Sequence, residues 1–332
     1  MKKAVFINQS QKSVSIVFAR RQMERIHHLV NIQEACVSAE DLASGVAEDA
    51  VVAFSTWGMP TLDEETIRRH LPSLQALFYA AGSVQAFVRP FLNCGKQVFS
   101  AWRANGRSVA QYAAAQIMLA LKGYFQVQST LDHYGRDAAL KRFRGFPGAY
   151  DVRVGLLGCG AIGSQVAQIL RDTDCEVWVY DPFLPKTRAE SLGVRLASME
   201  EVFRECHVVS NHLANLPETR NIIRREHLMN MRPYSTFINT GRGAQLNEQD
   251  LYDALSADNT RTALLDVLIH EGQTDSNPLL HLPNCFITPH IAGASGREVC
   301  RMADCIMDAF EEWESGRNPD CEVTEKMLDT MA

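Results

Sequence analysis

The chain has 332 residues, of which 46% are apolar, so it is long for one domain and two domains with full hydrophobic cores are expected. No apolar run approaches a membrane span, and a formal net charge of −6 with mixed signs argues against nucleic acid or an anionic membrane as partner. Nine scattered cysteines without a C-x-x-C pair predict free thiols in a reducing cytoplasm, and ten histidines without metal-ligand spacing predict no metal. The first ten residues, MKKAVFINQS, have too short an apolar run for a signal peptide.

The first hundred residues alternate between strand-like and helix-like stretches, which predicts a small α/β domain. Helices are expected over Arg20–Leu29 and from the Gly82-Ser83-Val84 turn to about residue 93. The apolar runs expected to form strands are residues 4–8, 49–55, 77–81 and 98–100.

A strong helix is expected over residues 108–123, where small and apolar residues dominate. The residues alone leave two roles open for this helix, a buried connector or a subunit contact. Residues 135–150 follow with three glycines, Pro147 and several arginines, and this composition predicts an irregular loop.

Residues 152–181 contain the most informative pattern in the chain. An apolar run, Val152–Leu157, predicts a buried parallel strand, and a second β-rich run ends at residue 180. Between them, Gly158, Gly160 and Gly163 have the G-x-G-x-x-G spacing of a strand-to-helix turn that binds a dinucleotide. The three glycines serve, in order, the tight turn, the close approach of a pyrophosphate, and the packing of the helix on the strand. The helix start offers N–H groups to that pyrophosphate.

Asp181 stands directly after the second β-rich run, 18 positions beyond Gly163 (181 − 163). A carboxylate there can accept hydrogen bonds from the adenosine ribose and would repel a 2′-phosphate, so NAD is expected in preference to NADP. Lys186 and Arg188 lie shortly afterwards and leave NADP open as the alternative. A glycine-rich turn in another kind of α/β protein is the simpler hypothesis, which the complete strand–helix–strand setting disfavours.

The strand and helix alternation continues after residue 181. With the two strands around the glycines, it predicts a six-stranded doubly wound sheet. Ser295 and Glu298 have the spacing of a capping box that opens a last helix to about residue 315. This helix is expected to return to the first domain. The further strands expected are residues 208–213, 236–240, 263–267 and 286–288.

Three ionisable residues follow strands of this predicted sheet, namely Arg242 in INTGRG, Glu271 in LLDVLIHE and His290 in ITPHIAG. Ligands of open α/β sheets bind beyond the carboxyl ends of the strands, so these side chains are expected to share one cleft. Arginine can bind a carboxylate, histidine exchanges protons near neutral pH, and a neighbouring glutamate favours the imidazolium. Taken singly, each could be a surface charge or a capping residue. His270 is the alternative proton donor and is disfavoured because it lacks the strand-end position.

Together these motifs resemble the D-isomer-specific 2-hydroxyacid dehydrogenase family. The matching stretches lie densely within residues 105–295: GLLGCGAIG, LPETRNII, FINTGRG, ALLDV with Glu271 five positions past Asp266, and NPLLHLPNCFITPHIAG. The resemblance implies an α/β protein with a doubly wound, parallel-sheet NAD-binding Rossmann-type domain, residues 105–294. This domain is inserted in a smaller flavodoxin-like α/β substrate domain made of residues 1–104 and 295–332.

The resemblance further implies an NAD-dependent reaction in which hydride passes between the nicotinamide and C2 of a 2-hydroxy or 2-keto acid. It makes Arg242, Glu271 and His290 catalytic, with His290 as the acid/base. It assigns the substrate carboxylate to Arg242 and to the backbone of Ser83 and Val84. A homodimer formed through the NAD-binding domain is also expected. The positions carried over as cofactor-binding are Gly158, Gly160, Ala161, Ile162, Gly163, Asp181, Leu213, Thr240, Gly241 and Asp266.

The chain departs from the family pattern mainly on the substrate side. The usual GVG reads GSV, the acidic residue that usually follows is Ala86, and the usual NAPG reads SAWR at residues 100–103. Trp102 could therefore line the substrate pocket and Arg103 could bind a second anionic group. The alternative for this pair is plain packing and a surface charge.

Other functions remain open at this stage. The alternative from a different class is an NAD-sensing binding protein of the corepressor type, with the same fold and no physiological turnover. Formate dehydrogenase is disfavoured because the sequences it resembles carry glutamine at the position of Glu271. L-lactate-type dehydrogenases are disfavoured because their glycine fingerprint lies near the N-terminus.

Overall fold

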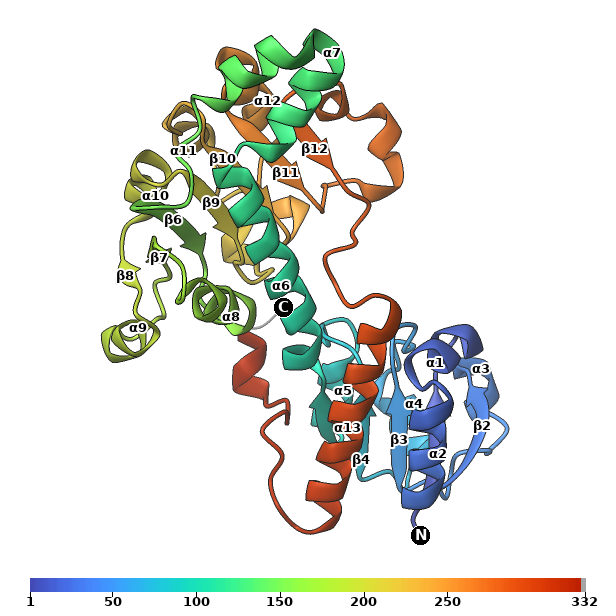
Figure 1. The fold of residues 1–332 in the computed structure, drawn as a ribbon. Coiled ribbons are helices and arrows are strands. Elements are labelled where there is room, and N and C mark those ends of the chain that lie inside the picture. The colour runs from blue at the N-terminus through green and yellow to red at the C-terminus, as the bar shows by residue number, and fades with distance from the viewer. Residues whose placement is uncertain (330–332) are drawn as a thin grey trace. The chain divides into compact units, whose positions relative to one another are not determined.

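The computed structural model describes residues 1–329 and separates into two compact units. Unit 1 combines residues 1–106 with the described residues from 294 to 329, and unit 2 is the intervening stretch, residues 107–293. Each unit is built on one parallel sheet with helices on both of its faces (Figure 1). The predicted α/β class with parallel sheets is confirmed.

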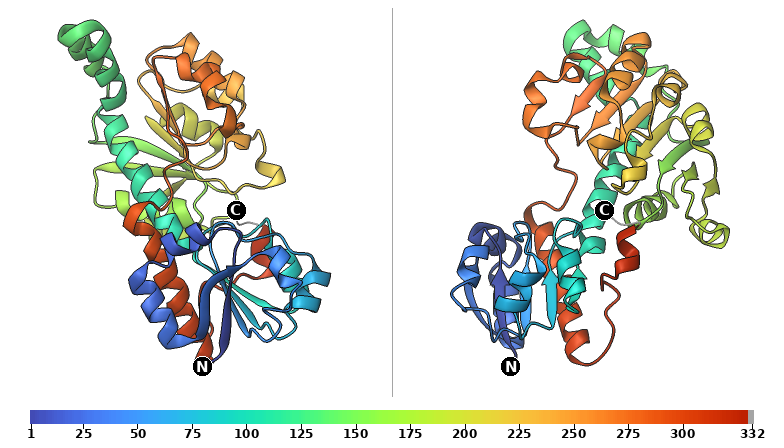
Figure 2. Two further views of the ribbon diagram at one scale, coloured as in Figure 1. Left: turned by 90° about the vertical axis from the view of Figure 1, so that its right-hand side faces the viewer. Right: turned by 180° about the vertical axis from the view of Figure 1, so that it is seen from behind.

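The sheet of unit 1 has five parallel strands in the order β2-β1-β3-β4-β5. Helix α13 packs against α1 and α2 on one face of this sheet, and α4 and α5 lie together on the other (Figure 2). The strands are β1 (Lys3–Ile7), β2 (Asn31–Val37), β3 (Val52–Ser55), β4 (Ala76–Tyr79) and β5 (Gln97–Ser100). The helices are α1 (Gln11–Val17), α2 (Arg20–Leu29), α3 (Ala39–Leu42), α4 (Glu64–His70), α5 (Val88–Asn93) and α13 (Val299–Glu314).

Strand β2 was absent from the sequence-based expectation, and its composition explains why. It lies at the edge of the sheet and most of its side chains are exposed, so NIQEACV contains no apolar run. The central strands β3 and β4 are buried along their whole length. Phe54, Phe78 and Phe99 from adjacent strands stack on one another, and Phe310 of α13 packs against the first two. This aromatic contact holds α13 within unit 1.

The sheet of unit 2 has seven parallel strands in the order β12-β11-β10-β9-β6-β7-β8. The six predicted strands are present, and the seventh, β8, is a two-residue exposed edge strand that carries no apolar signal. The strands are β6 (Val152–Leu157), β7 (Cys175–Tyr180), β8 (Arg195–Leu196), β9 (Val208–Asn211), β10 (Thr236–Asn239), β11 (Thr262–Leu265) and β12 (Cys285–Ile287). The helices are α6 (Trp102–Leu121), which begins before the unit boundary, α7 (Tyr124–Phe143), α8 (Ala161–Leu170), α9 (Lys186–Leu192), α10 (Met199–Glu205), α11 (Arg225–Met229) and α12 (Glu248–Ala257).

Unit 2 has a separate hydrophobic core on each face of its sheet, because successive residues of a strand point to opposite faces. In β10, Phe237 packs among side chains of α10, α11 and α12, whereas Ile238 packs among those of α6 and α8. Strand order reverses at β6, whose neighbours are β7 on one side and β9 on the other. The region beyond the carboxyl ends of β6 and β9 is therefore the expected ligand site of such a sheet.

The expectation of an irregular loop over residues 135–150 was wrong in its first part. Gly135 interrupts the helix with φ +80° and ψ 178°, but the helix resumes and continues to Phe143. The sequence signal from Gly135 was real, yet the following run DAALKRF consists largely of good helix formers. Among residues 1–329, no helix is both long and apolar enough to cross a membrane.

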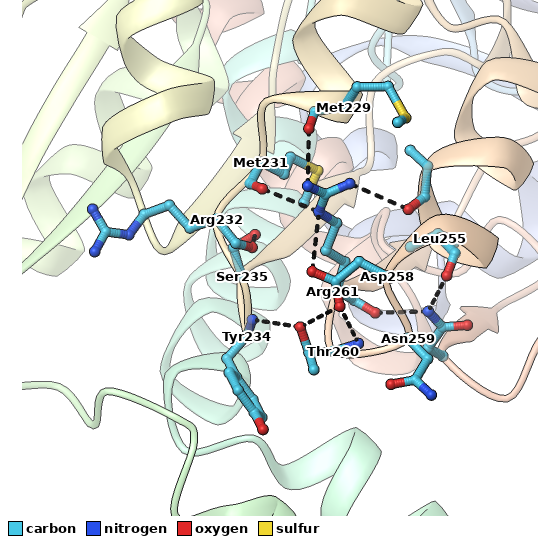
Figure 3. A network of polar contacts seen from close by, with 12 residues as sticks. Met229, Met231, Arg232, Tyr234, Ser235, Leu255, Asp258, Asn259, Thr260 and Arg261 are labelled. Carbon is cyan, nitrogen blue, oxygen red and sulfur yellow. Dashed lines mark hydrogen bonds and ion pairs between the residues drawn. The ribbon is translucent and has the colours of Figure 1, made fainter.

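Arg261 fixes the ends of two helices of unit 2 (Figure 3). Its guanidinium donates hydrogen bonds to the carbonyl oxygens of Met229 (2.8 Å) and Met231 (3.0 Å), at and just beyond the end of α11, and of Ala254 (3.4 Å), in the last turn of α12. The last carbonyls of a helix have no intrahelical hydrogen-bond donors, and this end of the helix carries a partial negative charge. The Arg261 guanidinium donates hydrogen bonds to these carbonyls and places a positive charge beside them. The Arg261 side chain is only 11% exposed. A carbonyl left without a hydrogen-bond partner away from water lowers the stability of the folded state.

Replacing this arginine tests the role of the contact. Arg261→Met should lower the free energy of unfolding by about 2–3 kcal/mol, because the part-buried carbonyls of Met231 and Ala254 lose their charged donor. Urea denaturation measures the effect. Arg20→Met is the matched control, since the Arg20 side chain is 93% exposed and forms a surface ion pair with Glu24. This ion pair should contribute about 1 kcal/mol or less to the free energy of unfolding. Equal effects of the two substitutions would contradict the assignment.

Candidate functional site

The three fingerprint glycines differ in what surrounds them. Gly158 follows β6 with φ +86°, a conformation that favours glycine. A Cβ on Gly163 would lie 2.1 Å from the Gly158 carbonyl oxygen, so a side chain there would force α8 away from β6. A Cβ on Gly160 would meet nothing within 4 Å. The packing around Gly160, the second of the three glycines, therefore gives no reason for glycine, whereas the close approach of a ligand does.

Helix α8 begins at Ala161, and its N-cap, Gly160, has no capping side chain. The first N–H groups of a helix, here those of Ala161, Ile162 and Gly163, have no acceptor within the helix. They lie at the positive end of the helix dipole. The start of α8 therefore offers backbone donors beside an open space, which suits the pyrophosphate of a dinucleotide.

Asp181 closes the strand next to this turn. One of its carboxylate oxygens accepts a hydrogen bond from the backbone N–H of Cys159 (2.8 Å), and the other accepts one from Phe183 (2.8 Å). The carboxylate is thus tied directly to the glycine turn. Burial, together with the nearby Asp181 charge, raises the pKa of the Cys159 thiol to about 11, while Arg188 acts in the opposite direction. Cys159 is therefore a neutral thiol at physiological pH.

The loops after β9 and β10 are held by a buried amide network that the sequence did not indicate. The side-chain nitrogen of Asn211 donates to the side-chain oxygens of Asn239 (3.0 Å) and Gln245 (2.7 Å). Gln245 in turn donates to the Leu213 carbonyl (3.0 Å). The only sign of this network in the sequence is an asparagine at the end of the apolar run VVSN, where a buried amide needs hydrogen-bond partners. The network positions the backbone of Leu213 and, through the Asn239 oxygen, the N–H of Gly241 (3.0 Å).

Thr240 and His212 present polar atoms to this region. The Thr240 hydroxyl is buried and has no hydrogen-bond partner among the described residues. His212 bonds to the Ser210 hydroxyl (2.9 Å), and burial lowers the pKa of its imidazole to about 4, so it is neutral. A Cβ on Gly158 would lie 2.8 Å from the His212 carbonyl, which places the ends of β6 and β9 in contact.

Arg242 lies in the turn after β10, and the structure brings this turn against the segment that leads to Glu271. A Cβ on Gly243 would lie 2.1 Å from the Leu268 carbonyl carbon, so the two backbones touch. The Arg242 guanidinium donates to the Gly241 carbonyl (2.8 Å), and its backbone N–H donates to Gln245 (3.2 Å). One hydrogen bond uses only one of five guanidinium N–H donors.

His290 and Glu271 form a pair. His290 Nδ1 lies 3.0 Å from a carboxylate oxygen of Glu271, and the two side chains are 47% and 48% exposed. His290 has φ +55°, an uncommon conformation for a residue other than glycine. A carboxylate at Nδ1 orients the imidazole ring and leaves Nε2 for another partner.

Asp266 directly follows β11 and is 2% exposed. Both of its carboxylate oxygens accept hydrogen bonds from the turn that holds His290, including those from Ile291 and Ala292 (2.8 Å each). The expected cofactor contact of Asp266 stays a prediction.

Apart from Arg242, the residues expected on the substrate side belong to unit 1. In the loop after β4, Val84 is fully buried and Ser83 is exposed. Arg103 forms an ion pair with Asp320 and lies over the Trp102 ring, 4.7 Å from its centroid. These contacts favour the packing alternative for Trp102 and Arg103.

The geometry of unit 2 fits NAD on four counts. These are the donor-rich start of α8, the open space at Gly160, the unpaired Thr240 hydroxyl, and the Asp181 carboxylate at the end of β7. In residues 1–329, no cluster of three or more His, Cys, Asp or Glu side chains is arranged to hold a metal ion.

Comparison with known families agrees with this geometry. Residues 115–292 match the family described as D-isomer specific 2-hydroxyacid dehydrogenase, NAD binding domain. The chain belongs to this family, and unit 2 is its NAD-binding domain.

Among curated relatives, the D-3-phosphoglycerate dehydrogenase of Methanocaldococcus jannaschii is 35% identical over 211 residues. That match covers 63% of this chain and 39% of the relative. The hydroxypyruvate reductase of Blautia hydrogenotrophica is 32% identical over 163 residues, which cover 49% of this chain and 50% of the relative. The chain thus spans half or less of the length of these relatives.

Solved structures show the fold over nearly the whole chain. The NAD-complexed form of a D-isomer specific 2-hydroxyacid dehydrogenase from Lactobacillus delbrueckii ssp. bulgaricus superposes with a TM-score of 0.76. The superposition covers 98% of this chain and 100% of that one at 20% identity. The D-lactate dehydrogenase of Lactobacillus jensenii, solved with NAD+, gives a TM-score of 0.75 over 98% of this chain and 100% of that one, also at 20% identity.

The position of Asp181 generates a prediction about cofactor choice. The protein should bind NADH more tightly than NADPH, and Asp181→Ala should reduce that preference about tenfold, because it removes a like charge facing the 2′-phosphate. Fluorescence titration with each cofactor measures both dissociation constants without requiring turnover. Asp172→Ala, which removes an exposed acid just after α8, should leave the preference unchanged. Equal affinity of the unmutated protein for NADH and NADPH would contradict this prediction.

Proposed function

We propose that the protein is an NAD-dependent D-2-hydroxyacid dehydrogenase that acts as a 2-ketoacid reductase. The observation that carries this proposal is the His290–Glu271 pair, 3.0 Å apart, in the same unit as the dinucleotide turn. An oriented imidazole at the carboxyl ends of the strands is suited to proton transfer with a substrate carbonyl. The match to the family's NAD-binding domain supports the same reading.

Each residue of the site has a separate task in this proposal. Arg242 binds the 2-ketoacid carboxylate through its planar guanidinium, and the backbone of Ser83 and Val84 also holds this carboxylate. His290 donates the proton from Nε2 to the substrate oxygen, while Glu271 holds the ring at Nδ1 and stabilises its positive charge. NAD, when bound in reduced form, supplies the hydride to C2. Unit 1 serves as the substrate domain.

The proton donor is tested by substitution. His290→Ala should lower kcat on the best 2-ketoacid by about two to four orders of magnitude, because the positioned acid is lost. NADH affinity should stay within about twofold, since the glycine turn and Asp181 are untouched. Glu271→Gln should give a milder loss, because an amide can still bond to the ring but cannot stabilise its charge.

His270→Ala is the matched control, since His270 is the exposed histidine directly before Glu271 in the sequence. It should retain near-normal turnover. If His290→Ala kept near-normal turnover while His270→Ala abolished it, the assignment of the acid would be wrong.

A homodimer formed through unit 2 is part of the proposal. Helices α6 and α7 leave large apolar side chains exposed, and a groove of about 360 Å³ with an apolar lining lies between α6 and α8. Such surfaces are typical of subunit contacts. The exposed apolar residues of the two helices are Leu119, Tyr124, Leu131, Tyr134, Leu140 and Phe143.

Light scattering tests the dimer. The protein should have twice the chain mass at micromolar concentration, and Leu131→Glu combined with Tyr134→Glu should shift it to the monomer by placing charges in the contact. Ile16→Glu is the control, because Ile16 is an exposed apolar residue on α1 of unit 1. A monomeric unmutated protein would count against the proposal.

The remaining parts of the proposal concern the setting. We infer a cytoplasmic location with free thiols, without nucleic acid or membrane as partner. None of the relatives compared above is described as a non-enzymatic NAD sensor, so the corepressor-type alternative gains no support.

A further inference from the structure

The Asp266 carboxylate is surrounded by donors from one short turn. It accepts hydrogen bonds from the Thr288 hydroxyl (2.6 Å) and the Ile291 N–H (2.8 Å) at one oxygen, and from the Ala292 N–H (2.8 Å) at the other. Asp266 is 2% exposed, so water does not readily replace these donors. An asparagine at this position would place its NH2 group opposite one of these donors, so that two donors would face each other. A carboxylate has only acceptor atoms and does not create this conflict.

The chain of hydrogen bonds extends to helix α6, and its direction follows from proton counting. The Tyr112 hydroxyl lies 3.1 Å from the Thr288 hydroxyl oxygen. Thr288 has a single hydroxyl hydrogen, which it donates to Asp266, since a carboxylate can only accept. Tyr112 is therefore the donor to Thr288. Burial is the main cause that raises the pKa of Tyr112. The Tyr112 hydroxyl therefore stays protonated and can act as the hydrogen-bond donor.

The turn that Asp266 holds carries His290. The His290 N–H donates to the Asp266 carbonyl (3.0 Å) and to the Thr288 carbonyl (3.0 Å), and the residue has φ +55°. Such a backbone conformation is unfavourable for histidine unless the surroundings impose it. The bonds to Asp266 from both sides of His290 supply that constraint.

We propose that Tyr112, Thr288 and Asp266 form a positioning chain that fixes the backbone of His290, and so directs its imidazole toward both Glu271 and the substrate. The proposal rests on the proposed function, in which His290 is the acid. The three residues act through His290 and do not contact the reacting atoms. Asp266 can still accept from a cofactor group, because a carboxylate has about four acceptor sites and three are occupied here.

Substitutions at Thr288 and Tyr112 separate positioning from general stability. Thr288→Val keeps the shape of the side chain but removes both hydrogen bonds, Thr288→Ser keeps the hydroxyl, and Tyr112→Phe removes only the outer donor. Tyr150→Phe, at a 78% exposed position, is the matched control. Two readouts are required: hydrogen exchange of the Ile291 and Ala292 amides in the protein without ligands, and kcat and KM for NADH and the best 2-ketoacid.

Thr288→Val should speed exchange of the two amides about tenfold or more and lower kcat about tenfold or more, with KM for NADH within about twofold. Thr288→Ser should restore both readouts, and Tyr112→Phe should shift them in the same direction by a smaller factor. The control should match the unmutated protein.

The outcomes distinguish this proposal from the proposed function. Unchanged amide exchange in Thr288→Val would overturn the positioning chain. Faster exchange with unchanged kcat would also overturn it, because a loosened turn would then leave the acid in place. If the unmutated protein reduced no 2-ketoacid, the proposed function would fail, and amide exchange alone would decide whether the chain anchors the turn.

Discussion

The close contact between the start of α8 and the end of β6 is the constraint on which the nucleotide site depends. Without a side chain at Gly163, the helix lies against the Gly158 carbonyl, where a Cβ would be 2.1 Å from the oxygen. This contact aims the unpaired N–H groups of α8 at the end of the sheet, at the position where strand order reverses. Asp181 joins the same turn through the Cys159 N–H. Packing and ligand recognition thus share one backbone contact.

Buried polar side chains at the strand ends serve mainly to hold loops. Asn211 and Gln245 hold the backbones of the loops after β9 and β10, and Asp266 holds the turn after β12. The side chains assigned to chemistry are more exposed, as the half-exposed His290 and Glu271 show. Fully satisfied buried networks are rigid. A rigid frame behind accessible side chains is the arrangement that precise positioning of an acid requires.

The sequence predicted those features that depend on residues close together along the chain. The glycine spacing, the apolar strands of unit 2 and the helix over Arg20–Leu29 are all present, because each depends on a local pattern. Strands β2 and β8 escaped prediction because edge strands need no apolar run. The donors around Asp266 come from residues 22 to 26 positions further along the chain, so no local sequence pattern predicts these hydrogen bonds. Prediction from periodicity therefore worked, whereas these buried polar contacts, made by the tertiary structure, were missed.

Reduction of a 2-ketoacid is the activity that we propose for this chain. The most direct measurement incubates the protein with NADH and a panel of 2-ketoacids, follows the loss of reduced-nicotinamide absorbance, and determines the configuration of the product at C2. We expect NADH oxidation with at least one 2-ketoacid, none with matched ketones that lack the carboxylate, and a D-2-hydroxyacid product. NADH oxidation no faster than in the absence of protein with every member of the panel, or an L product, would contradict it.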